Sequence, residues 1–200
     1  MLDRYFRPAK DRWLSPVAYA LGPRLSPNVL TWAAFVAGMA SAGAALQGQL
    51  WLGLALWVLN RVLDGLDGTK ARVHGQASAF GAYLDIVLDF VVYATVPAAL
   101  VVFFATPGLM LSGILLLAAF YVNAASWMYL AAILEQRREG AAARGESTAM
   151  PPGLIGGTET VVFYIAFFLW PSALTTLFQA MSALVLLTVI LRLWWAKRHL

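Results

Sequence analysis

Four aspartates, Asp64, Asp67, Asp85 and Asp89, lie on two consecutive segments that are predicted to be mainly apolar helices. The first two are three residues apart and the last two are four residues apart, so each pair lies on one helical face. A carboxylate near the centre of a bilayer costs about 2.5–3.5 kcal/mol on insertion scales, and nothing structural requires four of them. We therefore expect a functional site, in which the two helices lie adjacent and antiparallel and bring all four carboxylates into one pocket.

The carboxylates are predicted to hold divalent cations, because four negative charges in a medium of low dielectric constant repel one another strongly. Oxygen ligands of this kind suit Mg²⁺ or Mn²⁺. The chain has no Cys and only two His, which excludes a zinc site built from these residues. A pair of hard cations suits phosphoryl groups, since the metals neutralise phosphate oxygens and align the attacking oxygen.

Small and basic residues beside the aspartates fit a ligand that contains phosphate. Gly68 would let such a ligand approach the backbone closely, and Gly81, one turn before Asp85, would clear space on the same face. Arg72 could pair with phosphate oxygens through its planar guanidinium. The residues by themselves thus indicate a metal-assisted reaction of a phosphoryl group.

The elements that must position these residues are predicted from composition to be membrane helices. Hydrophobic residues make up 61% of the chain and charged residues 12%, against roughly 25% charged residues in a soluble domain. The mean hydropathy is +0.73. Every backbone polar group in a bilayer must be paired within the protein, and the long runs without alternation favour helices over barrel strands. We predict an all-α, polytopic membrane protein with one domain over residues 1–200.

The order of the segments predicts an interfacial helix followed by six spans. Residues 1–22 mix basic and aromatic side chains, which favours an amphipathic helix lying in the membrane interface over a solvated arm. Residues 28–195 are predicted to form a six-helix bundle. Its transmembrane helices are expected at residues 28–46, 51–73, 78–104, 109–135, 158–170 and 174–195.

The distribution of basic residues predicts the orientation in the membrane. We count every Lys and Arg in or near the N-terminal arm, the link at 70–75, the polar connection at 136–157 or the C-terminal tail. The three turns on the opposite side carry no charge. By the positive-inside rule, both termini and the acidic cluster face the cytoplasm. The net charge of +4 is then explained by membrane lipids with anionic headgroups, and no nucleic acid partner is expected.

A known sequence pattern covers the acidic cluster. Residues 64 to 89 read D-GL-D-G-TK-A-R, then eight residues, then G-AYL-D-IVL-D. This stretch resembles the motif of the CDP-alcohol phosphotransferase (phosphatidyltransferase) family, D-x2-D-G-x2-A-R, eight to nine residues, G-x3-D-x3-D. All eight fixed positions match, at Asp64, Asp67, Gly68, Ala71, Arg72, Gly81, Asp85 and Asp89. The six-helix layout also resembles that of the family, so the likeness extends over nearly the whole chain. Within the family, the sequence resembles a bacterial branch.

The resemblance implies roles for the motif residues. The metal ligands would be Asp64, Asp67, Asp85 and Asp89. Asp89 would also be the general base that acts on the acceptor hydroxyl. The CDP moiety would be bound by Gly68, Ala71, Arg72, Asp64 and Gly81. Physical chemistry is compatible with these roles, but the assignment of each aspartate rests on the family.

The resemblance also implies a reaction and a setting. A substituted phosphoryl group would pass from a CDP-linked donor, CDP-diacylglycerol in most bacterial members, to an alcohol acceptor, and CMP would be released in phospholipid biosynthesis. Members are usually homodimers, and a bacterial member would lie in the cytoplasmic (inner) membrane. The acceptor stays open between glycerol phosphate, inositol phosphate, serine, another polyol and a lipid alcohol. A small CDP-alcohol donor with diacylglycerol as acceptor also stays open, as does Mg²⁺ against Mn²⁺.

Charged residues outside the motif are candidates for binding the acceptor. They are Arg137, Arg138, Arg144, Glu159 and Arg192. Each also has a structural interpretation. The arginines of the polar connection could face lipid headgroups, Arg192 could reach the interface, and Glu159 could suit the positive end of a helix that Thr158 caps.

Three polar residues near the motif have local interpretations. Asn60 could contact the nucleotide or form an interhelical hydrogen bond. Lys70 could contact phosphate, but an interfacial lysine that reaches water is favoured, and His74 is interpreted as a solvated loop residue.

Three other functions could use membrane-embedded carboxylates. An intramembrane prenyltransferase would bind a prenyl diphosphate through similar aspartates, but it would usually be longer and would not require the Ala71–Arg72 pair. A divalent-cation transporter would be expected to show paired half-repeats or broken helices, and none is visible in the sequence. An intramembrane aspartyl protease would not explain four carboxylates.

Overall fold

The computed structural model describes residues 3–141 and 153–200 of the chain, and the side chains of residues 12–137 and 153–200. Throughout these ranges the regular elements are helical, which confirms the predicted all-α class. The elements are α1 (Asp3–Ala20), α2 (Pro27–Leu46), α3 (Leu50–Val73), α4 (Ala79–Phe104), α5 (Pro107–Ala141), α6 (Gly157–Leu169), the short 3₁₀ helix η1 (Pro171–Ala173) and α7 (Leu174–His199).

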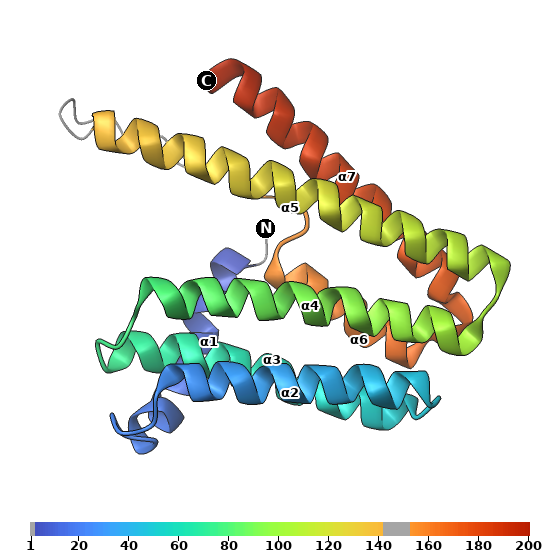
Figure 1. The fold of residues 1–200 in the computed structure, drawn as a ribbon, viewed down its shortest axis with the longest axis horizontal. Helices are drawn as coiled ribbons and strands as arrows, with labels where there is room; N and C mark the ends of the chain where they lie inside the picture. Colours follow the sequence, from blue (N-terminus) through green and yellow to red (C-terminus); the bar gives the residue numbers. More distant parts are fainter. Residues whose placement is uncertain (1–2, 142–152) are drawn as a thin grey trace.

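The helices form two packed groups that α6 joins (Figure 1). In the first group α2 packs against both α3 and α4, and α1 packs against α3. In the second group α5 packs along α7, as the yellow and red helices of Figure 1 show. Because α6 contacts both α3 and α7, and α4 contacts α5, the two groups form one continuous bundle.

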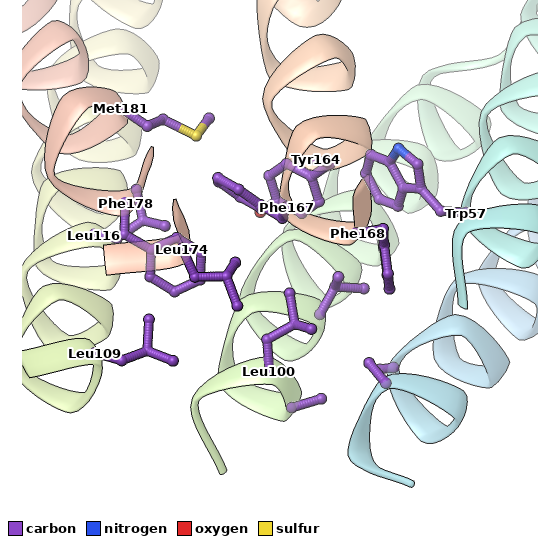
Figure 2. Close-up of a cluster of buried hydrophobic side chains, with 14 of the residues drawn as sticks. Trp57, Leu100, Leu109, Leu116, Tyr164, Phe167, Phe168, Leu174, Phe178 and Met181 are labelled. Carbon is purple, nitrogen blue, oxygen red and sulfur yellow. The ribbon is translucent and has the colours of Figure 1, made fainter. Parts of the chain in front are cut away.

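A buried aromatic cluster fixes α6 at the centre of this bundle (Figure 2). The ring of Tyr164 in α6 stacks on that of Trp57 in α3, with the ring centroids 4.5 Å apart. One turn later Phe167 meets Phe178 of α7 edge-on, with the centroids 4.7 Å apart. Aromatic pairs at such distances add roughly 0.5–1.5 kcal/mol beyond the burial of their area. The first turns of α6, which begin at Gly157, are thereby held close to α3 and α4.

Glycines allow the helices of the first group to approach closely. A Cβ atom at Gly38 of α2 would lie 2.6 Å from the side chain of Val92 in α4. A Cβ atom at Gly53 of α3 would lie 2.5 Å from the ring of Phe168 in α6. Small residues at such contacts are typical of membrane helices, whose association depends on close packing.

Four helices are long and apolar enough to cross a membrane in the part of the chain that the structure describes. They cover Pro27–Leu46, Ala79–Phe104, Pro107–Arg137 and Pro171–His199. α6 is apolar but has only 13 residues. α3 has 24 residues but carries five charged side chains, at Arg61, Asp64, Asp67, Lys70 and Arg72. The predicted count of six spans therefore requires that α3 and α6 also cross the membrane.

The C-terminal end of α3 holds the loop between α1 and α2. Lys70 Nζ donates a hydrogen bond of 2.6 Å to the carbonyl oxygen of Gly22, and the Lys70 side chain is fully buried. The prediction of an interfacial Lys70 that reaches water is therefore wrong. His74 is half-buried rather than solvated, and its Nε2 lies 3.0 Å from the carbonyl oxygen of Ala18. These contacts place α1 beside the beginning of α2, next to the acidic cluster.

Candidate metal and nucleotide site

Three of the four aspartates come together between α3 and α4. One carboxylate oxygen from each of Asp64, Asp85 and Asp89 lies within 4.8 Å of the other two. Oxygens on one small divalent cation are at most about 4.2 Å apart, because each metal–oxygen bond is about 2.1 Å long. The three carboxylates would therefore have to move closer together for one cation to contact all of them. The donor set consists of oxygen atoms alone, which fits Mg²⁺ or Mn²⁺.

Asp67 lies outside this trio and is held by α2. Its side chain is buried, and its Oδ2 accepts a hydrogen bond of 2.6 Å from Thr31 Oγ1. Thr31 lies in the second turn of α2, 36 residues earlier in the chain. Asp67 therefore faces the start of α2, whereas the other three aspartates face the space between α3 and α4.

α2 is the helix that positions the two motif helices. The two motif helices were predicted to be adjacent, and carboxylates of both do come together, but α2 packs on both helices while the backbones of α3 and α4 remain farther apart. The charged side chains between α3 and α4 account for this separation, because they occupy the space that close helix packing would remove. Asn60 Nδ2 donates a hydrogen bond of 2.7 Å to the carbonyl oxygen of Ala34 in α2. This is the interhelical bond that was one of the two interpretations of Asn60.

A cavity of about 310 Å³ opens beside Asp67 and Asp85, and we call it the motif cavity. It is lined by Pro27, Asn28, Thr31, Asp67, Gly68, Ala71, Arg72, Gln76, Ala77, Ser78, Gly81, Ala82 and Asp85. Four of the five residues predicted to bind CDP line this cavity, while Asp64 lies deeper, among the carboxylates. The motif did not reveal Asn28, Thr31, Gln76 and Ser78, which reach the cavity from α2 and from the α3–α4 loop.

The wall of the motif cavity beside Gly81 is tightly built. Ser78 is the N-cap of α4, and its Oγ accepts a hydrogen bond of 3.0 Å from the backbone N–H of Gly81. A Cβ atom at Gly81 would lie 3.0 Å from both Ser78 Oγ and Asn28 Oδ1. Glycine therefore leaves room for two polar side chains that face the cavity.

A second cavity, of about 280 Å³, lies beside Asp89, and we call it the aromatic cavity. It is lined by Ile86, Asp89, Phe90, Tyr93, Phe120, Asn123, Trp127, Ile155, Gly156, Gly157, Thr160 and Val185. A much smaller space of about 10 Å³, the carboxylate cavity, lies between Asp64, Asp85, Asp89 and Asn60. Asp85 lines both the motif and the carboxylate cavity, and Asp89 lines both the carboxylate and the aromatic cavity. Two ligand-sized spaces thus meet at the carboxylates.

Arg61 is a buried cation in this site that the sequence reasoning missed. Its Nη2 lies 2.6 Å from Asp89 Oδ1, and its Nη1 lies 3.3 Å from Asp89 Oδ2 and 3.6 Å from Asp64 Oδ2. Arg61 is in the middle of α3, so the count that placed every Lys and Arg near the cytoplasmic segments is wrong for this residue. Its position one helical turn before Asp64, inside an apolar run, was the signal that could have identified it.

The candidate acceptor residues have different surroundings. Arg192 is buried, and its Nη1 donates hydrogen bonds of 3.1 Å to Asn123 Oδ1 and 3.2 Å to Ser126 Oγ, which places it behind the wall of the aromatic cavity. Glu159 Oε2 accepts a hydrogen bond of 3.1 Å from the backbone N–H of Gly156, so it caps the start of α6. Gly156, not Thr158, is the N-cap residue of this helix.

The arginines of the polar connection are described only in part. Arg137 is exposed, and its Nη1 donates a hydrogen bond of 3.0 Å to the carbonyl oxygen of His199 at the end of α7. The backbone of Arg138 belongs to α5, but its side chain lies outside the described residues, as does the whole of Arg144. Of these three, only Arg137 has a described contact, and it joins two helix ends.

Comparisons with known proteins agree on one family. Residues 24–194 match the family model of CDP-alcohol phosphatidyltransferase. Inner membrane protein YnjF of Escherichia coli (strain K12) is 32% identical over 197 residues, which cover 97% of this chain and 94% of that protein. The crystal structure of Mycobacterium tuberculosis phosphatidylinositol phosphate synthase with CDP-DAG bound has a TM-score of 0.69 at 24% identity, and covers 91% of this chain and 92% of that one. The crystal structure of the same enzyme in complex with manganese and citrate has a TM-score of 0.67 at 23% identity, over 90% and 87% of the two chains. At these identities, the likeness to the solved structures shows the fold.

Proposed function

This chain belongs to the CDP-alcohol phosphatidyltransferase family, and we propose that it transfers a substituted phosphoryl group from CDP-diacylglycerol to the hydroxyl of an alcohol, with release of CMP. One observation carries this proposal. The motif cavity shares Asp85 with the small carboxylate cavity, and the aromatic cavity shares Asp89 with it. A donor in the first cavity and an acceptor in the second would meet at the acidic cluster.

The motif cavity suits the nucleotide part of the donor. Its volume of about 310 Å³ lies at the lower end of the usual range for small-molecule sites. Gly68 and Ala71 present little bulk, while Arg72 offers a guanidinium to phosphate oxygens. The solved relative with CDP-DAG bound supports the choice of donor. In this arrangement the diphosphate lies toward Asp67 and Asp85, and the acyl chains extend into the bilayer.

Two divalent cations, Mg²⁺ or Mn²⁺, would be held by Asp64, Asp67, Asp85 and Asp89. The close carboxylate trio and its all-oxygen donor set fit such ions, and a relative with a similar fold was solved with manganese. Bound cations would neutralise the diphosphate and stabilise the charge on the departing CMP. The protein itself contributes the fixed orientation of the carboxylates and the separation of the two cavities.

Asp89 is proposed as the general base for the acceptor. Its carboxylate lines the aromatic cavity, where Asn123 and Thr160 offer polar groups to an alcohol. Asp89 accepts the proton of the hydroxyl while the alcohol oxygen forms a bond to the phosphorus distal to cytidine. The bond between that phosphorus and the bridging oxygen breaks, and the bridging oxygen leaves with the electron pair as part of CMP.

The setting of the reaction completes the proposal. We assign six spans to one domain over residues 1–200, with α3 and α6 crossing beside the four long apolar helices and α1 lying in the interface. Both termini and the carboxylates face the cytoplasm, where nucleotides are available. The protein works as a homodimer in a bacterial inner membrane, in phospholipid biosynthesis.

The direct test is CMP release by the purified protein. CDP-diacylglycerol is supplied with Mg²⁺ or Mn²⁺ and a panel of alcohols, namely glycerol phosphate, inositol phosphate, serine, polyols and diacylglycerol. Release that requires metal and one alcohol, and that is lost in Asp89→Asn, would establish the reaction and identify the acceptor. If wild-type protein releases no CMP with any alcohol, small CDP-alcohols with diacylglycerol are tried next. Failure of both donor classes would contradict the proposed function.

A further inference from the structure

Arg61 is surrounded mainly by residues of the acidic cluster and by aromatic rings. Its Nη1 donates a hydrogen bond of 2.7 Å to Tyr93 OH, and its Nε donates one of 2.6 Å to Asn60 Oδ1. The guanidinium carbon lies 5.0 Å from the ring centre of Trp57 and 5.1 Å from that of Tyr93. The side chain is only 10% exposed. Because Asn60 is itself bonded to α2, the guanidinium has little freedom to move.

The contacts of Arg61 are with the protein rather than with a ligand space. Arg61 belongs to the lining of none of the three cavities described above. Asp89 and Tyr93, which it bonds, both line the aromatic cavity and stand between it and the guanidinium. Arg61 can therefore affect a reaction in these cavities only through the residues that it holds and through its charge.

The hydrogen bonds from Arg61 occupy some of the lone-pair positions of the Asp89 carboxylate. A carboxylate has about four lone-pair positions, two on each oxygen. The guanidinium approaches both oxygens, at 2.6 Å and 3.3 Å, in the manner of a fork, and so occupies two of these positions. The two that remain can serve the two cavities that Asp89 lines, one toward Asp64 and Asp85 and the other toward the aromatic cavity.

The charge of Arg61 also acts on the cation site. Its Nη1 lies 3.6 Å from Asp64 Oδ2, so a positive charge is already present beside two members of the trio. A divalent cation that binds there is attracted by the carboxylates and repelled by this fixed charge. Arg61 therefore reduces the repulsion among the carboxylates and, in the same way, weakens the binding of a metal ion.

From this geometry we infer that Arg61 is a positioning residue, which restricts Asp89 to one bond with metal and directs its other free lone pair to the acceptor hydroxyl. The part of this inference that concerns the acceptor rests on the proposed function. The part that concerns charge does not, because it predicts the sign of a change in metal affinity that needs no turnover. Loss of Arg61 should lower kcat and strengthen metal binding. A residue with a purely structural role would not change turnover and metal affinity in opposite directions.

The experiment compares three variants of the full chain, purified in detergent. Arg61→Met removes both the positive charge and the pair of hydrogen bonds to Asp89. Arg61→Lys keeps the charge but not the paired hydrogen bonds. Lys70→Met removes another buried cation of α3, one that bonds the α1–α2 loop. The dissociation constant for Mn²⁺ is measured by electron paramagnetic resonance. The values of kcat and KM are measured by CMP release, and thermal unfolding reports the fold of each variant.

The expected results separate the effect of the Arg61 charge from its effect on the orientation of Asp89. Arg61→Met should lower kcat about 100-fold, the scale of a misplaced catalytic group, with the donor KM unchanged within about twofold. It should also bind Mn²⁺ several-fold more tightly. Arg61→Lys should keep the wild-type Mn²⁺ affinity within about twofold and lose at least about tenfold in kcat. Lys70→Met should lose stability while its kcat and Mn²⁺ affinity stay close to wild type.

Other outcomes would overturn the inference. If Arg61→Met binds Mn²⁺ more weakly and loses stability, as a disrupted cluster would, then Arg61 maintains the shape of the site instead of acting through Asp89. If Arg61→Lys has wild-type kcat, the paired hydrogen bonds from Arg61 to Asp89 are not needed for the reaction. Should Arg61→Met fail to fold, Arg61→Lys decides alone, through its kcat and its Mn²⁺ affinity. An inactive wild type whose Mn²⁺ affinity still rises in Arg61→Met would contradict the proposed function but not the charge effect.

Discussion

Thr31 of α2 donates a hydrogen bond of 2.6 Å from its Oγ1 to Asp67 Oδ2 of α3, and both residues are buried. This bond connects a helix that carries no aspartate of the motif to the one aspartate that stands apart from the close trio. Thr31 also lines the motif and the carboxylate cavities. The orientation of the Asp67 carboxylate is therefore set by a residue outside the motif.

Thr31→Val should impair the enzyme through Asp67. Valine has nearly the same shape as threonine but donates no hydrogen bond, so the Asp67 carboxylate would lose an orienting partner. We expect kcat/KM for the donor to fall about tenfold, and the free energy of unfolding to fall by about 1–3 kcal/mol. CMP release and thermal unfolding measure the two effects. Thr95→Val is the matched control, because the Thr95 hydroxyl bonds carbonyl oxygens of its own helix and Met39 Sδ of α2 but contacts no aspartate, and Thr95 lines none of the three cavities. The activity of this variant should not change.

Replacement of any motif aspartate by asparagine should abolish turnover. Asparagine keeps the size of the side chain but removes the negative charge that a metal ion or a proton requires. We expect Asp64→Asn, Asp67→Asn, Asp85→Asn and Asp89→Asn each to lower kcat by at least about 1,000-fold, a loss typical of essential catalytic groups. Each variant should still insert into the membrane. A near-normal rate in Asp89→Asn would show that another group is the base.

Gly81→Ala should weaken donor binding. The added methyl group would lie 3.0 Å from Asn28 Oδ1 and from Ser78 Oγ, and both side chains would have to move into or away from the motif cavity. We expect the donor KM to rise about tenfold, the equivalent of about 1.4 kcal/mol, with a smaller change in kcat. The kinetics of CMP release at varied donor concentration test this.

Gly43→Ala is the control for the effect of an added methyl group in a helix. A Cβ atom at Gly43 of α2 would have no atom within 4 Å. The change should leave the donor KM unaltered and raise the free energy of unfolding by about 0.4–1 kcal/mol. If Gly81→Ala behaves in the same way as Gly43→Ala, the nucleotide does not lie beside Gly81.

Removal of divalent cations should stop the reaction reversibly. Treatment with EDTA is expected to abolish CMP release, and added Mg²⁺ or Mn²⁺ should restore it, because the carboxylates alone would repel the diphosphate of the donor. Ca²⁺ is the informative comparison, since it prefers longer bonds and more ligands than three or four carboxylates supply. Activity that persists in EDTA after prolonged dialysis would argue against metal at the acidic cluster.

Much of the site could be predicted from the sequence because its information is local. The spacings of Asp64, Asp67, Asp85 and Asp89 place each pair on one helical face wherever the helices lie. The long apolar runs and the low share of charged residues, 12%, indicate a helical membrane protein, since the backbone polar groups must be paired within the protein in a bilayer. Gly68, Ala71, Arg72 and Gly81 line a common cavity with two of these aspartates, Asp67 and Asp85.

The relations between distant segments were decided by the tertiary structure. The sequence does not say that α2 packs on both motif helices, that Thr31 bonds Asp67, or that Arg61 bonds Asp89, 28 residues later. Lys70 reads as a surface residue until the α1–α2 loop is placed over it. Spacing along a helix fixes the face on which a side chain lies. Which helix covers that face, and which buried charge it meets, follows from how all the helices pack together.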